Sequence, residues 1–162
     1  MKRQNRTEEY CETTFNSLKA NVHNWGKPEY NRPLSRIYYC GVFDCGNPNP
    51  TGLISAKALK NKKNKLKTVC DHYLSPQFVG RLILDNPDVY LRDYITFRKL
   101  FVKCTETIVV TQEENENLSE LTKNVKGNFI VKIPTNLKYH YLGIKLYKRE
   151  DGVKGWKKEN CT

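Results

Sequence analysis

Three side chains suited to phosphodiester hydrolysis lie in two short segments of the sequence. Asp71 and His72 are adjacent, and Asn115 follows His72 by 43 residues (115 − 72 = 43). An imidazole with a pKa near neutrality can take a proton from water at physiological pH. Carboxylate and amide oxygens are hard ligands that suit Mg²⁺ or Mn²⁺, and one such ion can neutralise a phosphate and steady its leaving oxygen.

Two strands and a helix are needed to position these side chains. Residues 66–73 alternate apolar and polar positions, which predicts a short strand ending at Asp71-His72. Residues 105–111 are β-branched almost throughout and predict a second strand. Thr111 is followed three residues later by Glu114, the pattern of a capping box, so we expect a helix from there to about residue 123.

The order of the first two residues imposes a condition on the site. Successive residues of a strand point to opposite faces, so Asp71 and His72 can serve one site only if the strand ends or bulges there. The Ser75-Pro76 pair that follows permits such an end. The same pair is a good helix opening, with serine as N-cap and proline at the first helical position.

Strand, strand and helix, with an Asp-His pair on the first strand and an Asn on the helix, resemble the ββα-metal (HNH, His-Me finger) nucleases. The likeness is greatest to the small phage-encoded members that include free-standing homing endonucleases. Val109-Val110 followed by Asn115 fits the family's spacing, and the resemblance covers roughly residues 67–123. It implies a metal-dependent DNA endonuclease with His72 as general base and with Asp71 and Asn115 as ligands of one Mg²⁺ or Mn²⁺ ion.

The chain departs from the family pattern in three ways. The distance from His72 to Asn115 is longer than in compact members, which predicts a helical insertion over residues 76–103 between the two core strands. Asn117 is an alternative to Asn115, because only Glu116 separates the two asparagines. The position that often holds a further histidine in the family has none here, since the only others are His23 and His140.

The predicted fold class is α+β, with a ββα-metal core, the helical insertion and a C-terminal β-hairpin. Further strands are expected at 36–43, 129–133 and 141–148, a helix within 53–65, and a hairpin turn at residues 150–152. Gly26, Pro28 and Pro33 predict irregular structure before the first of these strands. The predicted organisation is a polar N-terminal extension (1–36), the nuclease-like core (37–125) and a basic, β-rich segment (126–162).

The charge of the chain predicts a polyanionic partner. Lys and Arg number 28 against 17 Asp and Glu, a formal net charge of +11. Six lysines fall within residues 57–67, and a second basic block over 132–158 alternates with aromatic residues, which suits phosphate contact and stacking on double-stranded DNA. The representative contact residues are Lys62, Lys63, Lys145, Lys148 and Arg149. Solvated lysine loops, or a basic nucleic-acid-binding protein without catalysis, are the alternatives.

The remaining composition limits compartment and cofactors. No apolar run is long enough to span a membrane and the first 35 residues hold no apolar signal core, so we expect a cytoplasmic protein, in the host cytoplasm if phage-encoded. Cys40, Cys45, Cys70 and Cys104 could close a structural zinc site. Alternatively, Cys70 and Cys104 are buried apolar residues and Cys45 is a loop thiol. No organic cofactor is indicated, and the sequence leaves oligomeric state and target sequence open.

Overall fold

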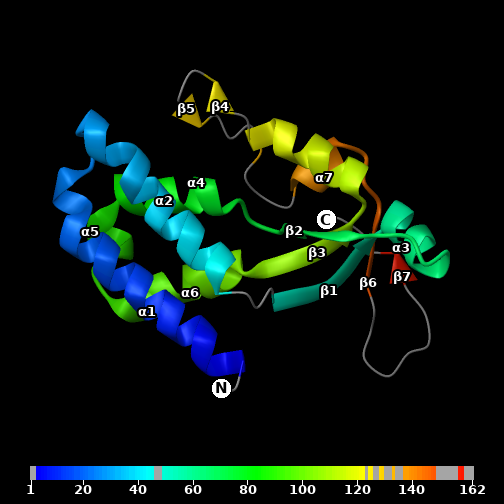
Figure 1. The fold of residues 1–162 in the computed structure, drawn as a ribbon, viewed down its shortest axis with the longest axis horizontal. Coiled ribbons are helices and arrows are strands. Elements are labelled where there is room, and N and C mark those ends of the chain that lie inside the picture. Colours follow the sequence, from blue (N-terminus) through cyan, green and yellow to red (C-terminus); the bar gives the residue numbers. More distant parts are fainter. Residues whose placement is uncertain are drawn as a thin grey trace. The chain divides into compact units, whose positions relative to one another are not determined.

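The computed structural model describes residues 3–45, 49–122, 124–125, 128–129, 133, 137–148 and 157–158. The fold is α+β, as predicted, and the chain forms two compact units (Figure 1). Unit 1 combines residues 1–49 with 74–105, and unit 2 combines residues 50–73 with 106–162. Within the described residues, no helix is both long enough and apolar enough to cross a membrane.

Unit 1 is helical and has an aromatic core. Its elements are α1 (Arg3–Asn21), the 3₁₀ turn η1 (Val22–Asn24), α2 (Pro28–Asp44), α4 (Pro76–Asp85), α5 (Pro87–Tyr90) and α6 (Tyr94–Cys104). Helix α1 packs against α2 and α6, and α2 packs against α4. The fully buried ring of Tyr38 meets Phe97 and Phe101 edge to face, at 6.0 Å in both cases. As predicted, Ser75 caps α4, and its hydroxyl accepts from the Phe78 N–H.

Helix α2 corrects the strand expected over residues 36–43 and the irregular segment expected before it. Leu34, Tyr38 and Val42 are buried at intervals of four residues, which is the repeat of a helix face and not of a strand. Pro28 occupies the first turn, where its missing N–H costs nothing, and the helix continues through Pro33. Composition suggested a strand here, but the burial of one helical face decided the structure.

Unit 2 is built on a five-stranded sheet with strand order β2-β3-β1-β6-β7. Its strands are β1 (Asn49–Ser55), β2 (Val69–His72), β3 (Glu106–Val110), β6 (Leu146–Lys148) and β7 (Lys157–Lys158), and a separate pair joins β4 (Asn124–Val125) and β5 (Asn128–Phe129). Its helices are α3 (Ala56–Lys63), α7 (Gln112–Ser119), the 3₁₀ turn η2 (Glu120–Thr122) and α8 (Leu137–Tyr141). Strands β2 and β3, β1 and β6, and β6 and β7 pair antiparallel.

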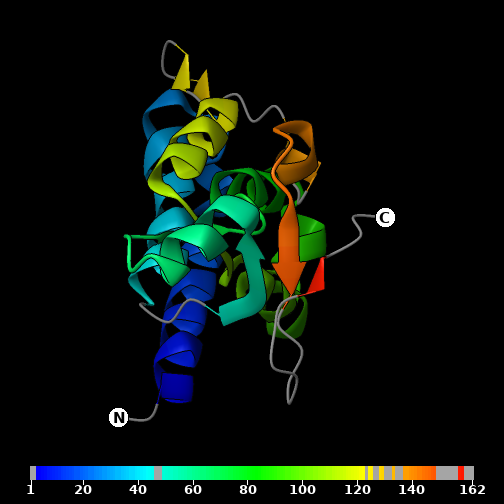
Figure 2. The ribbon, with the colours of Figure 1, turned by 90° about the vertical axis from the view of Figure 1, so that its right-hand side faces the viewer.

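The core of unit 2 lies between one face of this sheet and helices α7 and α8. Ile108 and Val110 of β3 are fully buried, and they cluster with Leu118 of α7 and Tyr139 of α8. Helix α3 begins beside the start of β6 (Figure 2). There, the Ala56 N–H donates to the Lys145 carbonyl at 2.9 Å. Asp71 and His72 therefore lie on a strand of this sheet, and Asn115 lies on α7, one of the helices that cover it.

The division into units differs from the predicted domains. Residues 1–36 are not a separate extension, because Phe15 of α1 packs against Phe97 at 5.3 Å in the core of unit 1. The helices expected as an insertion over 76–103 belong to that same unit.

Three local expectations near the C-terminus had different outcomes. The strand predicted over 141–148 is confined to β6, because α8 ends at Tyr141 and the chain turns at residues 142–143 before β6 begins. Of the strand expected over 129–133, residues 128–129 form β5 and residues 130–132 lie outside the described residues. The turn expected at residues 150–152 also lies outside them.

Candidate active site

Strands β2 and β3 form a regular antiparallel pair that carries Asp71 and His72 at its end. The register runs without interruption from Val69 opposite Val110 to His72 opposite Thr107, and the Tyr73 N–H still donates to the Glu106 carbonyl at 2.9 Å. No bulge interrupts β2, which ends at His72. Asp71 and His72 could serve one site if the strand either ended or bulged there, and in the structure it ends there.

The register assigns the two side chains to different faces. Asp71 lies opposite Ile108, whose side chain is fully buried in the core of unit 2, so Asp71 belongs to the face covered by α7 and α8. His72 lies opposite Thr107 and belongs to the other face. A phosphate that reaches both side chains must therefore lie around the end of β2.

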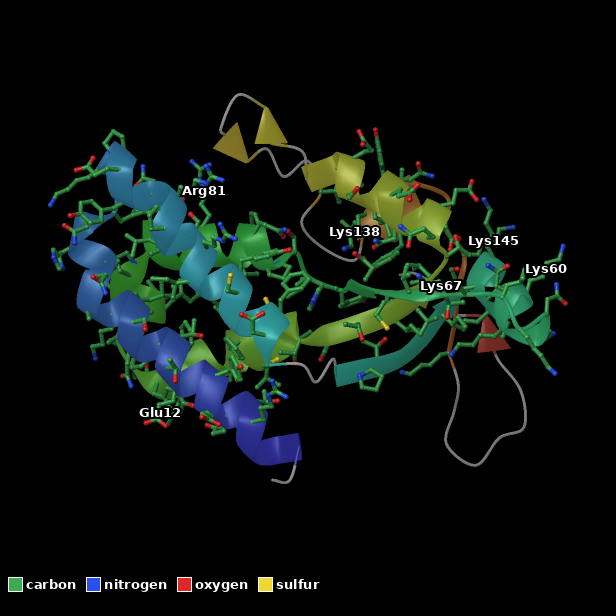
Figure 3. The ribbon with its side chains drawn as sticks, viewed as in Figure 1. Glu12, Lys60, Lys67, Arg81, Lys138 and Lys145 are labelled. Carbon is green, nitrogen blue, oxygen red and sulfur yellow. The ribbon has the colours of Figure 1, made fainter. Side chains whose placement is uncertain are left out.

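The Asp71 carboxylate is anchored by two residues of α8, Lys138 and Tyr139, of which Figure 3 labels Lys138. The Lys138 ammonium lies 2.6 Å from Asp71 Oδ2 and also donates to the His72 carbonyl at 2.6 Å. The Tyr139 hydroxyl donates to the same Oδ2. Burial, together with the negative charge of Asp71, raises the pKa of Tyr139 well above its ordinary value, so the phenol stays protonated and remains a donor.

This anchoring was not predicted from the sequence. Lys138 and Tyr139 were assigned to a basic, aromatic surface block, but their side chains are almost fully buried. Nothing in the local sequence separates a buried lysine from its exposed neighbours. The partner that makes burial possible, Asp71, is 67 residues away (138 − 71 = 67).

Asn115 is positioned by a network at the start of α7. As predicted, Thr111 and Glu114 form a capping box in which each side chain bonds the backbone of the other. The buried Glu114 carboxylate also accepts from the Ser55 hydroxyl at 2.5 Å, and Ser55 in turn caps α3 by accepting from the Ala58 N–H. One carboxylate thus ties the first turns of α3 and α7 together.

Replacing Glu114 with Ala is expected to lower the free energy of unfolding by about 2–3 kcal/mol, because it leaves the buried Ser55 hydroxyl and the Thr111 N–H without their acceptor. Urea unfolding measures the loss. The control is Glu116→Ala, an exposed position on the same helix, for which we expect a change below about 0.5 kcal/mol. Equal effects in the two variants would contradict the role assigned to Glu114.

The structure distinguishes Asn115 from Asn117 by burial. Asn115 is half-buried, three residues before the buried Leu118 and so on the same side of α7, which packs against β2. Its backbone N–H donates to the Thr111 carbonyl at 3.0 Å, whereas its side-chain amide makes no hydrogen bond with another described residue. Asn117 is exposed. Burial and helical position therefore favour Asn115 over Asn117 as the residue that faces β2.

Asp71 and Asn115 carry oxygens of the kind that bind a hard divalent cation. Asp71 Oδ1 makes no hydrogen bond with a described residue, and the side-chain carbonyl of Asn115 is likewise uncommitted within that set. Such an ion would share Asp71 with the Lys138 ammonium, which already neutralises part of its charge. Two protein oxygens with water and phosphate completing the shell suit Mg²⁺, which retains several waters in its protein sites.

The structure does not bring the four predicted zinc cysteines together. Cys104 lies in the core of unit 1, the Cys45 thiol is buried and donates to the Val42 carbonyl at 3.1 Å, and Cys70 is exposed on β2. Among the described residues, no group of three or more His, Cys, Asp or Glu side chains could hold a metal ion. The expectation that Cys70 is buried is also wrong, because its strand position faces away from the core.

A fifth cysteine, Cys11, lies in the core of unit 1. Burial raises the pKa of the Cys11 thiol to about 11, which keeps that thiol protonated.

The predicted DNA-contacting lysines lie in unit 2. Lys62 and Lys63 are exposed in the last turn of α3, Lys145 is exposed just before β6, and Lys148 is exposed at the end of β6. Arg149 lies outside the described residues. Comparison with known proteins adds no relative: no family model, no curated protein and no solved structure matches the chain.

Proposed function

We propose that the protein is a metal-dependent DNA endonuclease of the HNH type, resembling most the homing endonucleases of phages. One observation carries the proposal. The Asp-His pair ends a strand that pairs in register with β3, and β3 leads through a capped turn into the helix that bears Asn115 and packs against that first strand. This is the order of elements and residue types expected of a ββα nuclease core.

The proposed roles follow from the chemistry of each group. His72 takes the proton of the attacking water. Asp71 and Asn115 hold one Mg²⁺ or Mn²⁺ ion, which when bound supplies neutralisation of the phosphate and stabilisation of the leaving 3′-oxygen. Lys138 and Tyr139 hold the Asp71 carboxylate in one orientation through Oδ2 and leave Oδ1 for the ion.

The test is cleavage of supercoiled plasmid by the purified protein in Mg²⁺, in Mn²⁺ and in EDTA. We expect nicked or linear product with either metal and none in EDTA. A library of long random targets accompanies the plasmid, because a homing enzyme cuts few sites. Cleavage that persists in EDTA, or an uncut library in both metals, would contradict the proposal.

A second candidate function is supported by the ion pair at Asp71. Lys138 and Tyr139 give Asp71 a structural reason to be present, since a carboxylate that is 16% exposed is stabilised by its paired ammonium. The protein would then be a basic nucleic-acid-binding protein without catalysis. That candidate predicts salt-dependent binding that is indifferent to divalent metal and to His72.

A further inference from the structure

A cationic pocket lies between α3 and the start of α7, within unit 2. Its volume is about 460 Å³, and its lining includes Lys57, Lys60 and Lys67 together with Asn61, Asn64 and the Glu113 side of α7. Figure 3 labels Lys60 and Lys67 near α3 in unit 2. The sequence presented these lysines only as members of a run, without separating those that line a pocket from those that do not.

Helical spacing explains which residues of α3 face the pocket. Lys57, Lys60, Asn61 and Asn64 follow i, i+3, i+4 and i+7 spacing and so share one side of the helix. Ala58, on a different side, is fully buried. The exposed Lys62 and Lys63 lie in the same last turn but do not line the pocket.

A helix C-cap brings Lys67 back to the same pocket. The Leu66 N–H donates to the Asn61 carbonyl at 2.8 Å and the Lys65 N–H to the Lys62 carbonyl at 3.2 Å, which is the Schellman pattern. Lys65 takes the left-handed conformation that this cap requires, with φ at 58°. The chain therefore reverses after α3, and Lys67 joins Lys60 in the lining.

The charge in this pocket is not balanced by the protein. Lys57 pairs with Glu113 at 3.2 Å, while Lys60 and Lys67 have no acidic partner among the described residues. The helix dipole favours lysines at a helix C-terminus, but it favours Lys62 and Lys63 in the same way. The dipole therefore does not explain why Lys60 and Lys67 line one pocket. Two uncompensated ammonium groups beside two side-chain amides match the oxygens of a phosphodiester.

We propose that this pocket binds backbone phosphates of nucleic acid next to the site of cleavage, an inference that deepens the proposed function and rests on it. Lys67 is five residues from His72 (72 − 67 = 5), a chain distance of at most roughly 18 Å. That distance spans about five base steps of a duplex at ~3.4 Å each. The pocket therefore engages phosphates a few steps from the one at β2, and Glu113 competes with them for Lys57.

The experiment compares two pairs of substitutions that remove the same charge. Lys60→Gln/Lys67→Gln removes two charges from the pocket, and the control pair Lys19→Gln/Lys99→Gln removes two exposed charges from helices α1 and α6 of unit 1. Fluorescence anisotropy measures binding to a duplex over a salt series in EDTA, where no cleavage occurs. Circular dichroism melting verifies that both variants are folded.

The pocket pair is expected to weaken duplex binding by about tenfold or more at 0.1 M salt and to reduce the salt slope by about 2. The control pair should change affinity by about twofold or less, and Glu113→Gln should tighten binding by freeing Lys57. Equal losses in both pairs, or an unchanged slope in the pocket pair, would overturn the proposal.

Two further measurements accompany the binding experiment. The first distinguishes nucleic acid from free phosphate as the ligand, and the second distinguishes failure of the pocket proposal from failure of the proposed nuclease function. If titration calorimetry shows inorganic phosphate binding that depends on Lys60 and Lys67 while the duplex does not bind, the ligand is not nucleic acid. Cleavage is scored separately in metal. Loss of duplex binding in the pocket pair supports the pocket even if no cleavage is found, and cleavage with an unaffected pocket pair overturns only the pocket.

Discussion

Substitution of His72 by Ala is expected to lower the rate of metal-dependent DNA cleavage by about 10²–10⁴-fold, the contribution typical of a positioned general base. The reason is that an imidazole can accept a proton near neutral pH, whereas Oδ2 of the adjacent Asp71 carboxylate already pairs with Lys138 and Tyr139. Single-turnover cleavage of plasmid measures the loss. Duplex affinity in EDTA should change by less than about twofold.

The matched control for this prediction is His140→Ala. His140 is an exposed histidine on α8, in the same unit and adjacent to Tyr139. Its loss should leave both cleavage and binding near wild type. A His72→Ala variant that cleaves as fast as wild type, or one that loses DNA binding in parallel with cleavage, would remove His72 from the role of base.

Replacing Lys138 with Met is expected to lower the free energy of unfolding by about 3 kcal/mol, the lower end of the cost of breaking a buried ion pair. The Lys138 side chain is only 6% exposed, and its removal leaves Asp71 with Tyr139 as its one remaining partner among the described residues. The lower end applies because Asp71 retains some contact with water and keeps that hydroxyl donor. Urea unfolding at pH 7 measures the difference.

A double-mutant cycle separates the ion pair from packing. Adding Asp71→Asn to Lys138→Met should restore most of the lost stability, because no buried charge then lacks a partner. Lys145→Met, at an exposed lysine of the same unit, is the control and should lie within about 0.5 kcal/mol of wild type. Additive effects of the two substitutions would show that Lys138 and Asp71 do not depend on each other.

The parts of the fold that the sequence predicted are those with local signals. The β-branched run that became β3, the Ser75-Pro76 opening of α4 and the Thr111–Glu114 capping box each depend on residues within one turn or one strand. Helix α2 was missed because its aromatic and β-branched residues favour a strand by composition, and its helical face is defined by partners distant in sequence.

The candidate site was predictable only in its outline. Asp71, His72 and Asn115 could be selected from strand and helix signals, and the burial of Asn115 agrees with the choice made over Asn117. The anchoring of Asp71 by Lys138 and Tyr139 joins segments with no local relationship and was not foreseeable. The same holds for the division into units, which brings residues 1–49 together with 74–105.

The most direct test of the central claim is the location of a bound divalent ion on the folded protein. Substoichiometric Mn²⁺ broadens the NMR signals of nearby nuclei, so it detects weak binding and maps it to residues. We predict that backbone amide signals near Asp71, His72 and Asn115 broaden first, that Asn115→Ala weakens this binding by at least about tenfold, and that Asn117→Ala leaves it unchanged. Broadening that is spread over the surface, or confined to another part of the chain, would contradict the account.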